Sequence, residues 1–123
     1  MFIKVMVFSA SMKVRRPWGY YETLRNAPGW QLKILVINPG HAISLQKHKH
    51  RSEHWTVASG SGLFTVGNKV LAKKAGQDVF IKKGQKHRIS NNGKKPVTIV
   101  EVQFGEIISE DDIIRFEDHY GRA

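Results

Sequence analysis

The chain consists of short runs of β-branched and aromatic residues that glycine, proline and asparagine interrupt at close intervals. Runs rich in Val, Ile, Thr, Phe and Trp favour strands, and clusters such as NPG at 38–40 and SGSG at 59–62 favour turns. The runs that we predict as strands are 32–38, 42–48, 54–59, 62–67, 69–73, 78–82, 87–90 and 97–104. Many short strands at such spacing are typical of an all-β sandwich or closed barrel.

One short helix is predicted near the end of the chain, over residues 109–118 (SEDDIIRFED). Ser109 is a favourable N-cap, and Asp112 stands at the capping-box position. The length of 123 residues allows a single domain with one modest core. We therefore expect one domain over 15–123, preceded by an N-terminal extension or strand over 1–14.

The balance of charge restricts the partners of the protein. Twenty Lys and Arg residues against 10 Asp and Glu give a formal net charge of +10, which attracts anions such as nucleic acid or phosphorylated metabolites. The basic residues are spread along the chain without the long block of a nucleic-acid-binding tail. No apolar run approaches the roughly 20 residues that cross a bilayer, and the first residues are weak as a signal peptide. We expect a cytoplasmic protein that binds a small molecule rather than nucleic acid or membrane.

Candidate metal ligands are concentrated in QKHKHRSEH, residues 46–54. Gln46 and His48 leave the same face of a predicted strand, Glu53 lies on the next strand, and His87 follows a turn. Because the chain has no cysteine, a metal must use nitrogen and oxygen ligands. These four side chains suit zinc, manganese, iron, cobalt or nickel. The alternative is a metal-free barrel in which the same residues line a polar cavity.

The spacing of glycine, histidine and glutamate in two blocks of the chain resembles the two motifs of cupins. A longer resemblance, over residues 15–122, is to the C-terminal isomerase domain of type II phosphomannose isomerases, often fused to mannose-1-phosphate guanylyltransferase. The segments that carry it are RPWGYYE, PGHAISLQKHKHRSEHW, GQKHRISN, EVQFGE and EDDIIRFEDHYGR. Gln46 in the first ligand position belongs to the type II motif itself.

This resemblance implies a cupin fold, the double-stranded β-helix, and a metal-dependent aldose–ketose isomerase. The implied reaction interconverts mannose 6-phosphate and fructose 6-phosphate and feeds GDP-mannose and polysaccharide synthesis. Zinc is the expected divalent metal, and the habit of cupins implies a homodimer. Nucleotidyl transfer is not expected from this chain.

Aldose–ketose exchange needs a base with a pKa near neutrality that moves a proton between C2 and C1. On the run 97–104, Glu101 and Gln103 alternate with an apolar face, and we expect them to face the cavity because a sugar site must be polar. Glu101 is the first candidate base. His50, at the strand break after His48, is the second candidate and an alternative ligand.

A cationic side chain must hold the substrate phosphate, and arginine has the planar fork for this role. Arg115 is placed over the mouth of the barrel by the predicted C-terminal helix. The candidate substrate-binding residues are Arg115, Arg51, Arg88, Lys86 and Arg16, with Gln103 as a further contact. Two other functions remain open: a non-catalytic sugar-phosphate-binding cupin or accessory subunit of a separate guanylyltransferase, and a nucleic-acid binder.

Overall fold

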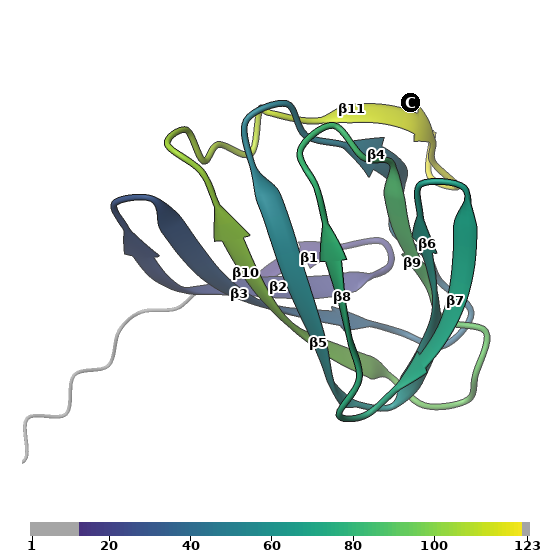
Figure 1. Ribbon diagram of the computed structural model, residues 1–123. Coiled ribbons are helices and arrows are strands. Elements are labelled where there is room, and N and C mark those ends of the chain that lie inside the picture. Colours follow the sequence, from purple (N-terminus) through teal and green to yellow (C-terminus); the bar gives the residue numbers. More distant parts are fainter. Residues whose placement is uncertain (1–12, 122–123) are drawn as a thin grey trace, which may run out of the picture.

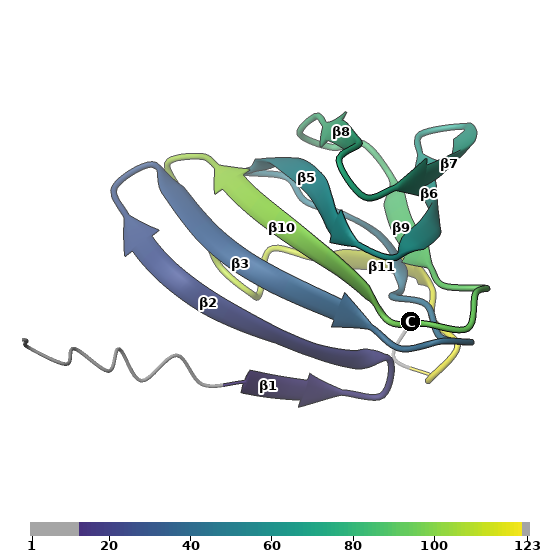
Figure 2. The same ribbon diagram turned by 90° about the horizontal axis from the view of Figure 1, so that it is seen from below.

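The computed structural model describes residues 13–121, which form two antiparallel sheets facing each other across a barrel (Figure 1). One sheet has six strands in the order β1-β2-β3-β10-β5-β8, and the other has five in the order β11-β4-β9-β6-β7. The strands are β1 (Lys13–Arg16), β2 (Gly19–Ala27), β3 (Trp30–Ile37), β4 (Leu45–Lys47), β5 (Ser52–Ser59), β6 (Ser61–Val66), β7 (Lys69–Lys74), β8 (Asp78–Ile81), β9 (His87–Ser90), β10 (Val97–Phe104) and β11 (Ile114–Glu117). Figure 2 shows the long strands β2, β3 and β10 lying side by side.

The core lies between the sheets because inward and outward side chains alternate along each strand. On β10, the buried residues Val97, Ile99, Glu101 and Gln103 alternate with partly exposed ones. The apolar core contains Trp18, Leu35, Ile37, Ile43, Trp55, Val57, Phe64, Val79, Ile81, Ile89, Val97 and Ile99. Burial of each large apolar side chain stabilises the fold by about 1.5–3 kcal/mol.

The RPWGYYE segment makes a close backbone crossing at Gly19. This residue has a φ of +151°, and a Cβ added there would lie 1.9 Å from the carbonyl oxygen of Val36. Gly19 pairs with Ile37 at the end of β3, so any larger residue would push β2 away from β3. The glycine thus fixes the position of the neighbouring Trp18, which is buried in the core.

The all-β class predicted from the sequence is confirmed, and the bounds of β9 and β10 coincide with the predicted runs. The predicted run 42–48 is regular strand only over Leu45–Lys47. β2 was not predicted; its exposed residues Leu24, Arg25 and Asn26 weaken the local pattern. Residues 1–12 of the predicted N-terminal segment lie outside the described residues.

The predicted C-terminal helix over 109–118 is wrong. The chain from Ile114 to Glu117 is strand β11, which pairs with β4 in a register that places Arg115 opposite Gln46. The capping signals do act locally, since the Ser109 hydroxyl accepts a hydrogen bond from the Asp111 backbone N–H at 3.1 Å. The backbone of Ile114–Glu117 forms its hydrogen bonds with the edge of β4 instead of within a helix. An unpaired strand edge offers a row of free donors and acceptors for such pairing.

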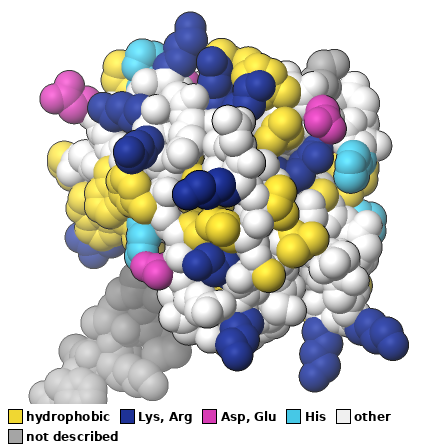
Figure 3. All heavy atoms as spheres, turned by 45° about the vertical axis from the view of Figure 1, so that its right-hand side comes forward, with side chains coloured by type: hydrophobic (Ala, Val, Ile, Leu, Met, Phe, Trp, Pro, Cys, Tyr) yellow, Lys and Arg dark blue, Asp and Glu magenta, His cyan; other side chains and the backbone are white. Residues whose placement is uncertain are grey.

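The described part of the chain holds no helix that is long and apolar enough to cross a membrane. Lys and Arg side chains are spread over the face drawn in Figure 3, between hydrophobic and uncharged groups. They do not gather there into one continuous basic stripe.

Candidate metal centre

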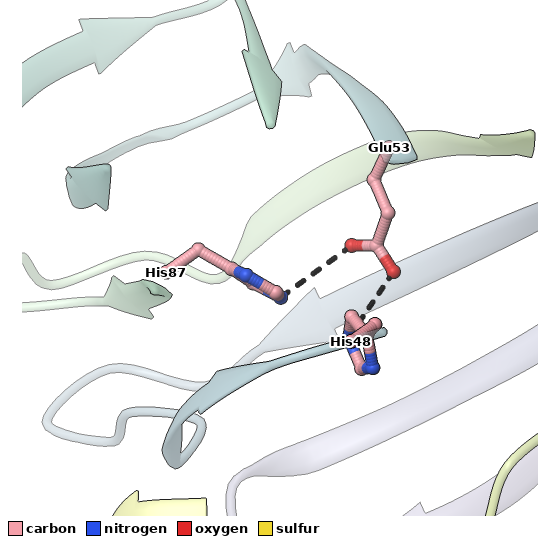
Figure 4. Close-up of side chains that lie close together, drawn as sticks. All are labelled: His48, Glu53 and His87. Atoms are coloured by element: carbon pink, nitrogen blue, oxygen red, sulfur yellow. Dashed lines mark ion pairs between the residues drawn. The ribbon is translucent and has the colours of Figure 1, made fainter. Parts of the chain in front are cut away.

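Three side chains from different strands or their ends converge inside the barrel. His48 follows β4, Glu53 lies on β5 and His87 begins β9. Their potential ligand atoms all lie within 4.8 Å of one another, and all three residues are buried (Figure 4). Glu53 Oε2 is 3.3 Å from His48 Nε2, and Glu53 Oε1 is 3.6 Å from His87 Nε2. The carboxylate therefore bridges the two imidazoles.

Backbone carbonyls fix the orientation of both rings. His48 Nδ1 lies 2.5 Å from the carbonyl oxygen of Asp112, and His87 Nδ1 lies 3.0 Å from that of Gln85. Because a carbonyl can only accept, each Nδ1 carries the proton and donates it, and each Nε2 presents a lone pair towards Glu53. This second contact is the usual support of a metal-ligating histidine.

Burial keeps both imidazoles neutral. It lowers the pKa of His48 to about 4 and also lowers the pKa of His87. Burial alone would raise the pKa of Glu53, but the charges that His87 and His48 carry when protonated, together with the permanent cation of Arg51, lower it below its usual range. Two neutral imidazoles beside a carboxylate are the protonation states that metal binding requires.

The geometry of the three residues fits a metal ion. Two ligands that each lie about 2.0–2.2 Å from a tetrahedral zinc ion are roughly 3.3–3.6 Å apart, and Glu53 lies at such a distance from His48 through Oε2 and from His87 through Oε1. His87 Nε2 is buried without a hydrogen-bond partner, although unpaired buried polar atoms are rare. A cation between these atoms would satisfy that nitrogen.

Arg51 also reaches this cluster. Its Nε donates to Glu53 Oε2 at 2.8 Å, and its Nη2 lies 3.2 Å from His48 Nε2. The residue is only 6% exposed, so it lies inside the barrel rather than on the basic surface. A metal bound to His48 would take the lone pair that the guanidinium now contacts, and Arg51 Nη2 would have to withdraw.

A second carboxylate lies beside the first. The Trp55 Nε1–H points at both, 3.1 Å from Glu53 Oε1 and 3.2 Å from Glu101 Oε2. Gln103 donates from Nε2 to Glu101 Oε1. Burial first, and then the charge of Glu53, raise the pKa of Glu101 to about 7. Glu101 is thus a carboxyl group that is able to accept and release a proton near neutral pH.

Glu53, Glu101 and Gln103 line a cavity of about 130 Å³. Gln46 also lines it, with its Oε1 accepting a hydrogen bond from the Ser44 hydroxyl at 3.1 Å. Of the predicted site residues, those that line the cavity are Gln46, His48, Arg51, Glu53, Glu101, Gln103, Arg115 and Arg16. His87 does not line the cavity itself but lies next to Glu53, which does. Their predicted roles as ligands, base and substrate contacts stay predictions.

The structure places three predicted residues elsewhere. His50 is exposed and lines a separate surface depression beside Lys83 and Glu106. Lys86 is exposed, with its ammonium 4.1 Å from the ring centroid of Phe116. Arg88 donates to the backbone carbonyls of Ile43 and Glu117 at 2.9 and 3.1 Å, so it fastens the end of β11 to the barrel.

Sequence reasoning missed two charged residues that line the cavity, Lys33 and Glu110. Lys33 is 4% exposed on the inner face of β3, which it shares with the core residues Leu35 and Ile37. The period of two that placed Glu101 inside the barrel would also have placed Lys33 there. Glu110 lies between β10 and β11, where no periodicity indicates its direction.

Comparison with known proteins gives a consistent picture of the chain. The sequence model of a family described as mannose-6-phosphate isomerase C-terminal matches residues 6–118. The xanthan biosynthesis protein XanB of Xanthomonas campestris pv. campestris is 46% identical over 111 residues, which are 90% of this chain and 24% of XanB. The mannose-1-phosphate guanylyltransferase ManC of Salmonella typhimurium is 38% identical over 111 residues, 90% of this chain and 23% of ManC. The chain thus spans about a quarter of the length of these curated relatives.

A solved structure confirms the type of barrel. A protein with a double-stranded β-helix domain from Klebsiella pneumoniae subsp. pneumoniae superposes with a TM-score of 0.71 at 25% identity, over 89% of each chain. The fold is therefore the double-stranded β-helix of cupins, as the resemblance of the two spaced motifs implied, and its strands and their ends carry the candidate metal centre.

Proposed function

Because the chain belongs to the mannose-6-phosphate isomerase C-terminal family, we propose that it is a metal-dependent isomerase of mannose 6-phosphate and fructose 6-phosphate. The observation that carries this proposal is the meeting of two kinds of group in one buried site. One is a set of neutral imidazoles and a carboxylate, His48, His87 and Glu53. The other is Glu101, whose pKa is raised to about 7. The product would feed GDP-mannose and polysaccharide synthesis.

His48, Glu53 and His87 would hold the metal, with Gln46 as the fourth predicted ligand. When bound, a divalent ion polarises the substrate carbonyl and stabilises negative charge that develops on oxygen. Zinc is the expected ion, and manganese, iron, cobalt and nickel suit the same nitrogen and oxygen ligands.

Glu101 is the proposed base. Its carboxylate would take the proton from C2 of the aldose, which leaves an enediolate. The proton of the C2 hydroxyl would pass to the C1 oxygen, and the carboxylic acid formed on Glu101 would return its proton to C1, which gives the ketose. A pKa of about 7 suits both halves of this transfer, because neither protonation state is strongly favoured at neutral pH. Trp55 and Gln103 hold the two carboxylate oxygens of Glu101 in place through hydrogen bonds.

The test is a coupled assay of the purified protein after removal of metal and after reloading with each candidate ion. We expect conversion of mannose 6-phosphate to fructose 6-phosphate only in reloaded protein. Absence of turnover with all five ions would remove the proposal. A cytoplasmic location and a homodimer accompany this proposal, and sedimentation of the purified protein tests the dimer.

A second candidate is a metal-free cupin that binds sugar phosphates without turnover. The contacts of the Arg51 guanidinium with Glu53 and His48 favour it, because a permanent cation already neutralises the buried carboxylate. Calorimetry distinguishes the two. This candidate predicts saturable binding of mannose 6-phosphate that is the same before and after metal removal.

A further inference from the structure

The cavity contains an ion pair whose two members are held in different ways. Lys33 is fixed on β3, in the middle of the larger sheet, and its side chain is only 5% exposed. Its carboxylate partner is Glu110, whose side chain is 56% exposed. Lys33 thus belongs to the wall of the barrel, whereas Glu110 reaches it from outside.

Glu110 lies on residues 105–113, the segment between β10 and β11, which we call the mouth segment. This segment is held over the metal centre by polar contacts rather than by regular strand pairing. The Ser109 carbonyl accepts from Arg51 Nη1 at 3.2 Å, and the Asp112 carbonyl accepts from His48 Nδ1 at 2.5 Å. The Asp112 carboxylate accepts the backbone N–H groups of Lys49 and His50, both at 2.9 Å.

The free space in the cavity is small while the mouth segment is in this position. The cavity measures about 130 Å³, whereas pockets for small organic ligands measure roughly 300–1,000 Å³. Glu110 and Ile113 of the mouth segment line the cavity, so their outward movement would enlarge the space for a substrate.

Withdrawal of Glu110 would leave Lys33 buried without its ion-pair partner. Glu101, opposite Lys33 on β10, has a pKa of about 7 and so compensates this charge only in part at neutral pH. An uncompensated charge inside a barrel is costly, so another anion should take the place of the carboxylate. A phosphate monoester is suited to this exchange because it carries about −1.5 to −2 charges at neutral pH and three acceptor oxygens. The wall beside Lys33 is also cationic: the Tyr21 ring lies 4.3 Å from Lys33 Nζ and 5.4 Å from the Arg16 guanidinium carbon.

We propose that Lys33 binds the phosphate group of the substrate and that the Glu110 carboxylate occupies this subsite until the substrate displaces it. The identity of the ligand as a sugar phosphate rests on the proposed function, whereas the anion subsite rests on the ion pair and the cavity. Glu110 is then an internal competitor of the ligand. Removing its charge should tighten phosphate binding rather than weaken it.

The experiment titrates inorganic phosphate into the full chain by calorimetry at constant pH and ionic strength. Glu110→Gln should bind phosphate about tenfold more tightly than the unmodified protein, because the competing carboxylate no longer occupies the subsite. The matched control is Glu106→Gln, which changes the charge of the same segment at an exposed glutamate. It should leave the phosphate affinity within twofold of the original.

Lys33→Met should weaken phosphate binding. In protein that carries Lys33→Met, adding Glu110→Gln should no longer tighten phosphate binding. Lys69→Met, at an exposed lysine of β7, controls for attraction of phosphate by the net charge of +10. Since Lys33→Met could fail to fold, Lys33→Arg is measured alongside it and should retain phosphate binding within a few-fold. Equal phosphate affinity of Glu110→Gln and the unmodified protein, or tightening that persists without Lys33, would overturn the proposal.

Failure of this inference and failure of the proposed function are separable. Phosphate titration requires no turnover, so the expected affinities without isomerase activity would leave the subsite standing and remove only the isomerase. Isomerase activity with a KM for mannose 6-phosphate that is unchanged in Glu110→Gln would remove the subsite and leave the isomerase standing.

Discussion

The two ends of the barrel interior are lined by the same strands but have opposite chemistry. Buried residues alternate along β3, β5, β9 and β10 with a period of two at both ends. At one end they are Lys33, Glu53, His87, Glu101 and Gln103; at the other they are Ile37, Val57, Ile89, Val97 and Ile99. The same strand geometry therefore buries mostly charged and polar side chains at one end of the barrel and aliphatic side chains at the other.

The energetic roles of the two ends differ. The apolar end stabilises the fold through removal of hydrocarbon from water, about 25 cal/mol per Å². The polar end is costly to bury, and its ion pairs and hydrogen bonds offset that cost without much surplus. We infer that the apolar end supports the fold and the polar end is retained for chemistry. Substitutions at the two ends should therefore affect different measurements.

The largest effect is expected at the polar end, from His87→Ala. Removing a residue that only hydrogen-bonds to a metal ligand lowers metal affinity by up to about 100-fold. Loss of the ligand itself should lower metal affinity by more than this and should abolish turnover. Elemental analysis after dialysis and the isomerase assay measure the two losses. His54→Ala is the control, because His54 pairs with Asp78 on the outside of the barrel at 2.7 Å. Full metal content in His87→Ala would contradict the assignment.

Glu101→Gln should lower kcat by about 10²- to 10⁴-fold, the usual contribution of a general base, and leave metal content unchanged. In the unmodified protein kcat/KM should fall as the pH drops below about 7, because protonated Glu101 cannot accept a proton. A profile that keeps this acid limb in the variant would assign the base elsewhere.

Measurements of unfolding free energy distinguish the expected loss of activity in Glu101→Gln from a loss of folded protein. The folded-state pKa of Glu101 lies above its ordinary value of 4.5, so the fold favours the protonated form. Stability should therefore decline as the pH rises from about 4.5 through 7, and Glu101→Gln should remove that decline. Denaturant titrations at several pH values measure it.

At the apolar end, Phe64→Ala should lower the free energy of unfolding by about 3–5 kcal/mol, the range for large aromatic-to-alanine changes in cores. Phe64 is fully buried, with its ring centroid 5.8 Å from that of Trp55. Denaturant unfolding of the metal-free protein measures the change. Phe80→Ala is the control, since Phe80 is 52% exposed on the outer face. A loss below 1 kcal/mol for Phe64→Ala would show that the apolar end does not carry the stability.

The smallest effect is expected from Arg115→Ala. Arg115 lines the cavity from β11, next to Gln46, and was predicted as a substrate contact. KM for mannose 6-phosphate should rise by one to two orders of magnitude, about 1.5–3 kcal/mol for a charge-assisted hydrogen bond, with metal content unchanged. Arg25→Ala, at an exposed residue of β2, is the matched control. A KM equal to that of the unmodified protein would remove Arg115 from the site.

Local pattern was sufficient for much of this molecule. Alternation over 97–104 predicted the inward direction of Glu101 and Gln103, and both are buried there. The placement of His48, Glu53 and His87 on different predicted strands indicated that they meet inside a barrel, and they do. The double-stranded β-helix itself was implied by the resemblance of the two spaced motifs to those of cupins. These features depend on the period of the strand and on short turns, which neighbouring residues in the chain determine.

Only the tertiary structure decided the state of the C-terminal segment and the partners of the buried charges. The capping signals at Ser109 and Asp112 were compatible with a helix, but β4 offered an edge that the segment paired with instead. Lys33 meets Glu110 across 77 positions of sequence, and Arg51 meets His48 and Glu53 where β5 begins. The physical reason is that strand pairing and charge pairing depend on which segments the closed barrel brings together, and no local period in the sequence contains that information.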